Sequence, residues 1–209
     1  VSMSEKGDVI AIGSPYNDAG VTDSDRGSVE VYNYDGTNWN QVGNDIEGSQ
    51  DQAYFGSSVS LSGDGNILAV GIPYHDISGN NNNGQVKIYQ WKDNAWDLME
   101  TITPAYDGTG SDKSDSEQFG NDVRLSSDGK TVAISDIWYS KSGGNQVGRV
   151  VAYRFNGSEW DPIGGQVNAL VGANAGDNLS WGLSLSSNGN IMAVGAHEYD
   201  KNTSKGDDA

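Results

Sequence analysis

The sequence predicts an all-β protein, a β-propeller built from four-stranded antiparallel blades. One sequence pattern, seen as Val59–Gly71 in one copy, recurs with starts at positions 1, 59, 123 and 183. Each copy carries short apolar runs separated by glycine-containing turns, which are typical of β-strands. No capped apolar stretch at helical spacing extends beyond about one turn. A repeat of ~60 residues that holds several strands is typical of a radial or stacked architecture, in which each unit covers the faces of its neighbours.

Residues 55–102 show the plan of one repeat. The predicted strands are residues 57–62, 66–71, 85–90 and 96–102. In the first strand Val59 and Leu61 alternate with serines, a pattern that is typical of a β-strand. The glycines of the Gly63-Asp64-Gly65 turn suit a tight hairpin. The second strand holds the continuous apolar run 67–70, which indicates burial on both faces and an inner position.

The other copies follow the same plan, which predicts a single domain over residues 1–209. The repeat units are residues 1–58, 59–122, 123–182 and the partial unit 183–209. Trp39, Trp96 and Trp160 occupy equivalent positions at the start of each fourth strand. We expect each indole to pack the outer strand onto its sheet, because a buried indole removes a large apolar area from water.

The composition excludes several classes of partner. The chain carries 29 acidic and 12 basic residues, a formal net charge of −17. This charge excludes nucleic acid and anionic membrane surfaces, because both require a basic surface. Membrane insertion is also excluded, since no apolar run approaches the roughly 18 residues of a spanning helix. The absence of cysteine excludes disulfides, thiol chemistry and cysteine-based zinc sites.

Glycine-containing elements recur around the strands of each unit. They are Phe55-Gly56 and Phe119-Gly120 before the first strand, Gly13-Ser14-Pro15 and Gly71-Ile72-Pro73 after the second, and Gly27, Gly84 and Gly148 at the start of the third. Together these elements resemble the FG-GAP repeat, the blade of the integrin α-subunit N-terminal propeller. The third unit departs from this pattern with Ser135-Asp136-Ile137, and Leu179-Ser180 stands where the next Phe-Gly pair is expected. Trp181-Gly182 is a shifted alternative for that pair.

The repeats account for about three and a half blades, whereas propellers close with roughly 4 to 8. The chain begins at Val1 inside a repeat, so we expect a processed or excised piece of a longer protein. Its partners are then the remaining blades of the same chain, in a seven-bladed ring as the resemblance implies, or a second copy that completes the ring. An open ring would leave strand edges exposed to aggregation.

No catalytic set stands out, which predicts that the chain is not an enzyme. The only histidines, His75 and His197, follow the second strands of different units. A lone loop histidine is more often a solvated or capping side chain than a general base. Phosphate-binding Gly-Lys loops and His-Glu-x-x-His pairs do not occur.

Calcium is the one cofactor that the resemblance suggests, because integrin-type blades often hold this ion in loops of Asp and Asn. A hard cation requires about 6 to 8 oxygen ligands. The candidate ligands are Asp18, Asp23 and Asp25 in one loop, and Asp107, Asp112 and Asp115 in another. Neither loop has the full Asp-x-Asp-x-Asp-Gly spacing, so turn-forming aspartates that bond the backbone are the alternative.

Three N-glycosylation sequons begin at Asn156, Asn178 and Asn202, all on predicted turns or loops. They predict a secreted glycoprotein with an extracellular or cell-surface location. The first sequon also suits a hairpin turn, which alone would explain its sequence.

The sequence predicts a non-enzymatic extracellular scaffold that adheres to other proteins through its loops. The long loops after the second strands, at 14–27, 72–84, 136–148 and 196–209, are expected on one rim. Their candidate contact residues are Tyr16, Tyr74, His75, Trp138, Tyr139 and Tyr199. Aromatic rings beside hydrogen-bonding groups are typical of interfaces and sugar sites, although the same rings can pack against neighbouring blades. A lectin-like propeller that binds glycans and a propeller appended to an enzyme outside this chain are the alternatives.

Overall fold

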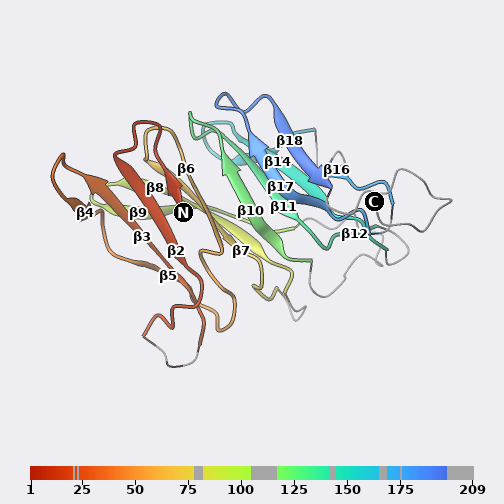
Figure 1. The fold of residues 1–209 in the computed structure, drawn as a ribbon, viewed down its shortest axis with the longest axis horizontal. Coiled ribbons are helices and arrows are strands. Elements are labelled where there is room, and N and C mark those ends of the chain that lie inside the picture. Colours follow the sequence, from red (N-terminus) through yellow and green to blue (C-terminus); the bar gives the residue numbers. More distant parts are fainter. Residues whose placement is uncertain are drawn as a thin grey trace.

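The computed structural model describes residues 1–20, 22, 24–77, 82–104, 117–141, 145–164, 169–174 and 176–196. Regular structure in these residues consists entirely of β-strands. Four antiparallel sheets, blades 1 to 4, follow one another in chain order (Figure 1). None of the described residues belongs to a helix that would cross a membrane.

Each blade is built from one continuous stretch of the chain. Blade 1 contains β1 (Ser2–Met3), β2 (Val9–Ser14), β3 (Ser28–Tyr34), β4 (Trp39–Gln41) and β5 (Ile46–Glu47). Blade 2 contains β6 (Ser58–Leu61), β7 (Ile67–Ile72), β8 (Gln85–Lys92) and β9 (Ala95–Ile102). Blade 3 contains β10 (Phe119–Leu125), β11 (Thr131–Asp136), β14 (Arg149–Phe155), β15 (Trp160–Pro162) and β16 (Leu170–Val171), with the side hairpin β12 (Ser140–Lys141) and β13 (Asn145–Gln146). Blade 4 contains β17 (Leu179–Leu185) and β18 (Met192–Ala196).

The predicted four-stranded plan is confirmed in the first three blades. Blade 2 is ordered β6-β7-β8-β9, and every neighbouring pair is antiparallel. In blades 1 and 3 the outer strand is interrupted, so that two short strands pair in turn with the third strand of the blade. The chain is all-β and forms part of a β-propeller.

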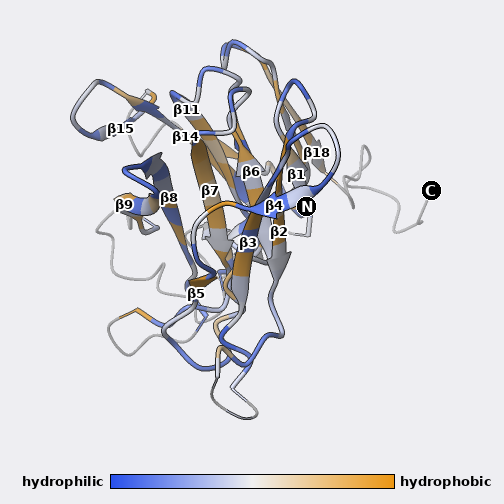
Figure 2. Cartoon of the chain, turned by 90° about the vertical axis from the view of Figure 1, so that its left-hand side faces the viewer, coloured by the Kyte–Doolittle hydropathy of each residue, from blue (hydrophilic) through white to orange (hydrophobic). Residues whose placement is uncertain are grey.

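The hydrophobic core is divided among the contacts between adjacent blades. Its members include Val29, Phe55 and Leu68 between blades 1 and 2, Ile88, Phe119 and Trp160 between blades 2 and 3, and Ala133, Val150 and Leu183 between blades 3 and 4. Figure 2 shows hydrophobic residues concentrated along central strands such as β7, with hydrophilic residues at the turns. Each unit therefore buries its apolar faces against its neighbours, as the repeat predicts.

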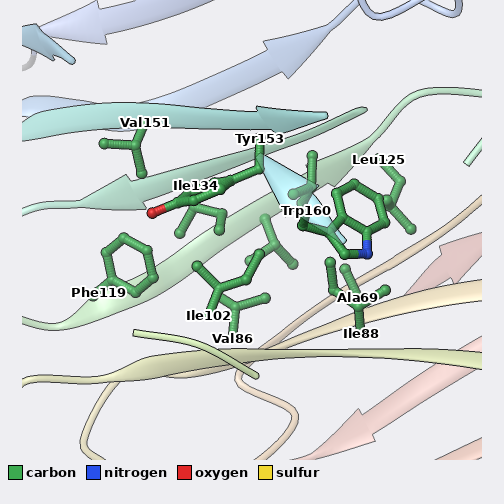
Figure 3. Close-up of a cluster of buried hydrophobic side chains, with 12 residues drawn as sticks. Ala69, Val86, Ile88, Ile102, Phe119, Leu125, Ile134, Val151, Tyr153 and Trp160 are labelled. Carbon is green, nitrogen blue, oxygen red and sulfur yellow. The ribbon is translucent and has the colours of Figure 1, made fainter. Parts of the chain in front are cut away.

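The three equivalent tryptophans show this dependence on neighbours. Trp160 of blade 3 is directed toward Ala69 and Ile88 of blade 2 and is 8% exposed (Figure 3). Trp96 of blade 2 packs against the cluster shared with blade 1. Trp39, in the first blade, is 45% exposed. The predicted packing role is confirmed for Trp160 and Trp96, whereas Trp39 is largely exposed and its ring lies against that of Tyr34 in its own blade.

Serines join the first strands of successive blades. The Leu61 N–H donates to Ser2 Oγ at 2.9 Å, and one blade further the Leu125 N–H donates to Ser60 Oγ at 2.9 Å. These hydroxyls satisfy backbone groups at strand edges that lack a paired strand. The alternating serines of the repeat are therefore contacts between blades.

A second set of contacts joins the hairpin tips that follow the first strands. The Glu5 N–H donates to the Gly63 carbonyl at 2.9 Å, the Gly63 N–H to the Ser127 carbonyl at 2.8 Å, and the Ser127 N–H to the Ser187 carbonyl at 2.7 Å. The four residues occupy the same position in their repeats. The backbone thus holds the four tips together along one rim of the molecule.

The Phe-Gly and Gly-Ile-Pro elements meet where consecutive blades touch. A Cβ on Gly71 would lie 2.0 Å from the carbonyl oxygen of Gly120, and a Cβ on Gly84 would lie 2.1 Å from that of Phe119. No side chain fits at these distances, so blades 2 and 3 require glycine at both positions. The equivalent glycines of blade 1 make the same contacts with blade 2.

Leu179 and Ser180 occupy the Phe-Gly position at the third interface. A Cβ on Gly148 would lie 2.1 Å from the Leu179 carbonyl oxygen. A Cβ on the equivalent Gly84 would lie at the same distance from the Phe119 carbonyl oxygen. Ser180 has a φ of 92°, close to the 89° of Gly120. Leu179-Ser180, and not the shifted pair Trp181-Gly182, therefore occupies the Phe-Gly position, and Ser180 has the backbone conformation of a glycine.

Candidate functional site

A concave site, the hairpin groove, lies between blades 1 and 2 at the rim where the hairpin tips are joined. Its volume is about 1000 Å³. It is lined by Glu5, Lys6, Asp8, Val9, Asn33, Gln41, Val42, Gly43, Gly63, Asp64, Gly65, Asn66, Trp91, Asn94, Ser127 and Asp128. Small-molecule sites in proteins have volumes of about 300 to 1,000 Å³, so a ligand of modest size fits here.

The lining is rich in hydrogen-bonding groups and carries net negative charge. It contains the carboxylates Glu5, Asp8, Asp64 and Asp128, and the carboxamides Asn33, Gln41, Asn66 and Asn94. Trp91 supplies the aromatic wall, with its ring 5.4 Å from that of Trp96. Lys6 is the basic side chain among the lining residues. Such a surface offers acceptors and donors for hydroxyl groups and an apolar plane for a sugar ring.

Glu5 connects three repeat units at this groove. It belongs to the hairpin of blade 1, and its backbone N–H bonds to Gly63 of blade 2. Its carboxylate accepts a hydrogen bond from Ser127 Oγ of blade 3, with Oε2 and Oγ 2.7 Å apart. The position of this carboxylate is thus fixed by the joined hairpin tips, while the residue itself is exposed to solvent.

Two of the groove carboxylates also build the turns that carry them. Ser62 Oγ donates to Asp64 Oδ1 at 2.6 Å, and the Asn66 N–H donates to the same oxygen at 3.0 Å. Burial acts to raise the pKa of Asp64, but the hydrogen bonds from Ser62 and Asn66 outweigh it and hold that pKa below its ordinary value. The hydrogen bond from Ser126 lowers the pKa of Asp128 in the same way. Both aspartates therefore remain ionised at neutral pH.

The candidate calcium ligands are only partly within the described residues. Asp18 Oδ1 accepts hydrogen bonds from the Ser24 N–H at 2.9 Å and the Asp25 N–H at 3.2 Å, so this carboxylate closes its own loop. Asp23, Asp107, Asp112 and Asp115 lie outside the described residues. Among the residues that the structure describes, no group of three acidic or histidine side chains is arranged to hold a metal ion.

The predicted contact residues of the loops fall into separate environments. Tyr16 and Tyr74 both lie against Tyr54, with ring centroids 5.4 and 5.0 Å from it. Trp138 contacts Trp181 across the interface of blades 3 and 4, with centroids 6.4 Å apart. Tyr139 lies under the Arg149 guanidinium, 4.0 Å from ring centroid to Cζ. His75 is half-buried, which lowers its pKa and leaves it neutral at pH 7, and Tyr199 lies outside the described residues.

The sequon asparagines differ in accessibility. Asn156 is exposed, and its Oδ1 accepts hydrogen bonds from the Ser158 and Glu159 N–H groups at 2.9 and 3.1 Å, which builds a turn. Asn178 is 7% exposed, so its amide is out of reach of a modifying enzyme in the folded chain. Asn202 lies outside the described residues.

The comparisons with known proteins show the fold. No protein-family model matches the sequence, and no curated protein matches it. A solved structure from Bacteroides uniformis with the provisional description 6-phosphogluconolactonase has a TM-score of 0.54 and 13% identity, over 92% of this chain and 45% of that chain. The periplasmic gluconolactonase PpgL of Pseudomonas aeruginosa has a TM-score of 0.45 and 14% identity, over 92% of this chain and 63% of that chain. A prolyl endopeptidase structure has a TM-score of 0.49 and 13% identity, over 92% of this chain and 24% of that chain.

These comparisons correct the predicted family. The match to a propeller described as a lactonase, with no family model for the sequence, contradicts the assignment to the FG-GAP and integrin α family. The physical reason lies in the interfaces between blades. The Phe-Gly and Gly-Ile-Pro elements that suggested the resemblance are explained by close backbone contacts, such as the one between Gly71 and Gly120.

The predicted function is corrected with the family. The sequence predicted a chain that is not an enzyme, namely an adhesive structural scaffold, with a lectin-like propeller or a module appended to an enzyme as alternatives. The Bacteroides uniformis structure that this chain matches is described as a 6-phosphogluconolactonase, which contradicts those predictions. The residues of the groove were missed because the groove is formed by three hairpin tips that are far apart in the sequence.

Proposed function

We propose that this chain is the substrate-binding part of a β-propeller hydrolase that opens a neutral, polyhydroxylated lactone in the hairpin groove. The observation that carries the proposal is the combination of four carboxylates, four carboxamides and one indole around a single cavity of about 1000 Å³. Hydroxyl groups of a sugar-like ring would bond to the carboxylates and amides. The apolar face of the ring would pack on Trp91.

The charge of the groove favours an unphosphorylated substrate. Four carboxylates and one ammonium group line it, and the whole chain has a formal net charge of −17. A phosphate ester would meet net repulsion here, because like charges disfavour association. The chemical class is therefore a neutral sugar lactone.

The opening of a lactone requires from the protein a general base and a group that stabilises developing negative charge. The oxygen of a water molecule attacks the ring carbonyl carbon, and a general base removes the proton from that water. The ring C–O bond then breaks, and the leaving alkoxide takes up the proton that the base has removed from the water, which restores the base. We assign the general base to Glu5, whose carboxylate Ser127 holds in place. The Lys6 ammonium would stabilise the negative charge that develops on the carbonyl oxygen.

The matched structures are longer than this chain. The chain spans 45% of the length of the Bacteroides uniformis protein, so the activity of the whole protein is also part of the proposal. We further propose that the protein is exported from the cytoplasm, the broader form of the location that the sequons predicted. Fractionation of the source cells tests that point separately.

Hydrolysis measured at constant pH tests the proposed function. Acid released from glucono-δ-lactone is titrated with and without the protein, to separate catalysis from spontaneous opening. The variant Glu5→Gln still accepts the Ser127 hydrogen bond but cannot take a proton, so its rate should fall by about 10²-fold or more. Glu47→Gln, which changes an exposed carboxylate on β5 outside the groove, serves as the control.

Two results would count against this function. One is a rate with the native chain equal to that of the spontaneous reaction. The other is full activity in Glu5→Gln together with loss in Glu47→Gln, which would place any catalysis elsewhere. A 6-phosphorylated lactone should react more slowly than the neutral lactone, because the groove repels its phosphate.

A further inference from the structure

A second cavity, the tyrosine pocket, lies on the opposite rim from the hairpin groove, where the long loops of blades 1 and 2 meet. Its volume is about 350 Å³, and it is lined by Pro15, Tyr16, Tyr54, Ser57 and Tyr74. The Tyr54 ring is in the middle. It meets the Tyr16 ring at 67° with centroids 5.4 Å apart, and the Tyr74 ring at 81° with centroids 5.0 Å apart. Three rings from three separate segments thus surround one small space.

The backbone at Tyr54 is in a conformation that tyrosine disfavours. Its φ is 56°, in the left-handed region that suits glycine and asparagine. The equivalent residues are Gln118, with a φ of 59°, and Asn178, with a φ of 46°. The loop therefore adopts the left-handed conformation in each of these three units, and in the third unit asparagine, a residue that favours it, fills the position. Residues held in a disfavoured backbone conformation are concentrated at ligand sites, where the contact of the side chain with the ligand offsets the conformational cost.

The three-ring arrangement occurs at one blade interface among those the structure describes. At the next interface Gln118 stands in place of the central tyrosine. At the third, Asn178 takes that place and Trp138 contacts Trp181 instead. The pocket is thus a specialisation of the first interface, and contact between blades does not itself require it.

The electrostatic surroundings of the pocket favour a cation. None of the five lining residues is charged. The Tyr54 N–H bonds to the Asp25 carbonyl at 3.3 Å, and burial together with the Asp25 carboxylate raises the pKa of the Tyr54 phenol, which stays neutral. The nearby Arg26 is paired with Asp51, its Nε 2.6 Å from Oδ1. The faces of neutral phenol rings attract cations, and the surrounding net charge adds to this attraction.

We propose that the tyrosine pocket binds a small alkylated ammonium group, of the kind carried by choline. A sugar ring is a poorer match, because the lining offers only phenol and serine hydroxyls, and Ser57 Oγ already donates to the Tyr54 carbonyl at 2.7 Å. Trimethylammonium is a sphere with an apolar surface and a positive charge. Both properties suit a pocket that is lined by three aromatic rings in a chain with a formal net charge of −17.

Titration with choline, followed by NMR of ring-labelled tyrosines, tests the proposal on the full chain. The matched probe is 3,3-dimethylbutan-1-ol, which has the shape of choline without its charge. Choline should shift the signals of the three pocket tyrosines and bind about tenfold more tightly than the alcohol, as expected for a cation–π site. Equal affinity for the two probes, or no shift with either, would overturn the proposal.

Variants separate binding from folding. Tyr54→Asn places the residue found at position 178 on the same backbone, so it should raise the thermal midpoint and weaken choline binding by about tenfold. Tyr54→Phe keeps the ring and should bind choline as the native chain does. Tyr34→Asn alters an exposed tyrosine outside the pocket and should leave binding unchanged. Native affinity for choline in a well-folded Tyr54→Asn variant would contradict the assignment.

A further titration distinguishes the two sources of such a group. Free choline and vesicles of phosphatidylcholine present the same trimethylammonium chemistry. Sedimentation with vesicles that is lost in Tyr54→Asn would identify a lipid headgroup as the ligand. Binding of free choline without vesicle sedimentation would identify a small soluble compound.

Discussion

Asp136 and Arg149 are cross-strand partners in blade 3, and their side chains form an ion pair that is almost closed to solvent. Arg149 Nε lies 2.8 Å from Asp136 Oδ2, and the two side chains are 5% and 0% exposed. In blade 2 the equivalent partners are Ile72 and Gln85. The third blade has therefore replaced a neutral pair with a charged one at the same point of the sheet.

Removing one member of this ion pair should destabilise the protein, whereas replacing both members together should change its stability little. Arg149→Gln and Asp136→Ile should each lower the free energy of unfolding by about 3 to 5 kcal/mol, because each leaves a buried group without its partner. The double variant copies blade 2 and should recover most of that loss. Urea unfolding of the four proteins measures the coupling. Additive losses in the double variant would show that the two side chains do not act as a pair.

The free energy of unfolding of the native chain should decrease as the pH rises from about 4 to about 7. Burial raises the pKa of Asp136 from its ordinary value of 3.8 to about 7, against the opposing effect of Arg149. The unfolded chain thus releases this proton at a lower pH than the folded chain does. Over that interval ionisation favours the unfolded state. Unfolding measured across this range should show the loss, and the Asp136→Ile variant, which lacks the carboxyl, should show a smaller slope.

Ser180→Gly should stabilise the protein by about 1 kcal/mol. Ser180 has a φ of 92°, and its buried Oγ has no hydrogen-bond partner among the described residues. Glycine removes both penalties and restores the residue found at Gly120 in the second interface. The reverse change, Gly120→Ser, should destabilise, because a Cβ there would lie 2.8 Å from the Gln85 carbonyl oxygen. Thermal unfolding of both variants gives the comparison, and a lower midpoint for Ser180→Gly would refute the strain argument.

Equivalent tryptophans should differ greatly in their contribution to stability. Trp160→Ala should cost about 3 to 5 kcal/mol, because it opens a cavity in the core between blades 2 and 3. Trp39→Ala should cost less than about 1 kcal/mol, since this side chain is 45% exposed and its ring lies at the surface beside that of Tyr34. Chemical unfolding distinguishes the two. Similar losses would mean that the exposed face of blade 1 is covered in solution.

The sequence was sufficient to predict the fold. The repeat spacing and the alternation around Val59 and Leu61 depend on local patterns, and the strands formed within one or two residues of their expected bounds. The aligned repeats also placed Leu179 at its structural position. These features are visible because each follows from the period of a strand or the geometry of a turn.

The candidate site could not be predicted from the sequence. Glu5 and Ser127 are 122 residues apart, and each stands in a hairpin that looks like an ordinary turn. Only the radial arrangement brings their side chains together beside Trp91. The glycine elements led to the wrong family for a related reason. Close backbone contact between blades requires glycine at these positions whether or not two proteins are related.

A crystal structure of the chain with gluconolactam, a lactam that resists hydrolysis, would test the central claim most directly. The account predicts the ring in the hairpin groove, with its apolar face on Trp91, its hydroxyls bonded to the groove amides, and its carbonyl near Glu5 and Lys6. A lactam bound at any other place, or an empty and accessible groove at saturating lactam, would contradict the proposed function.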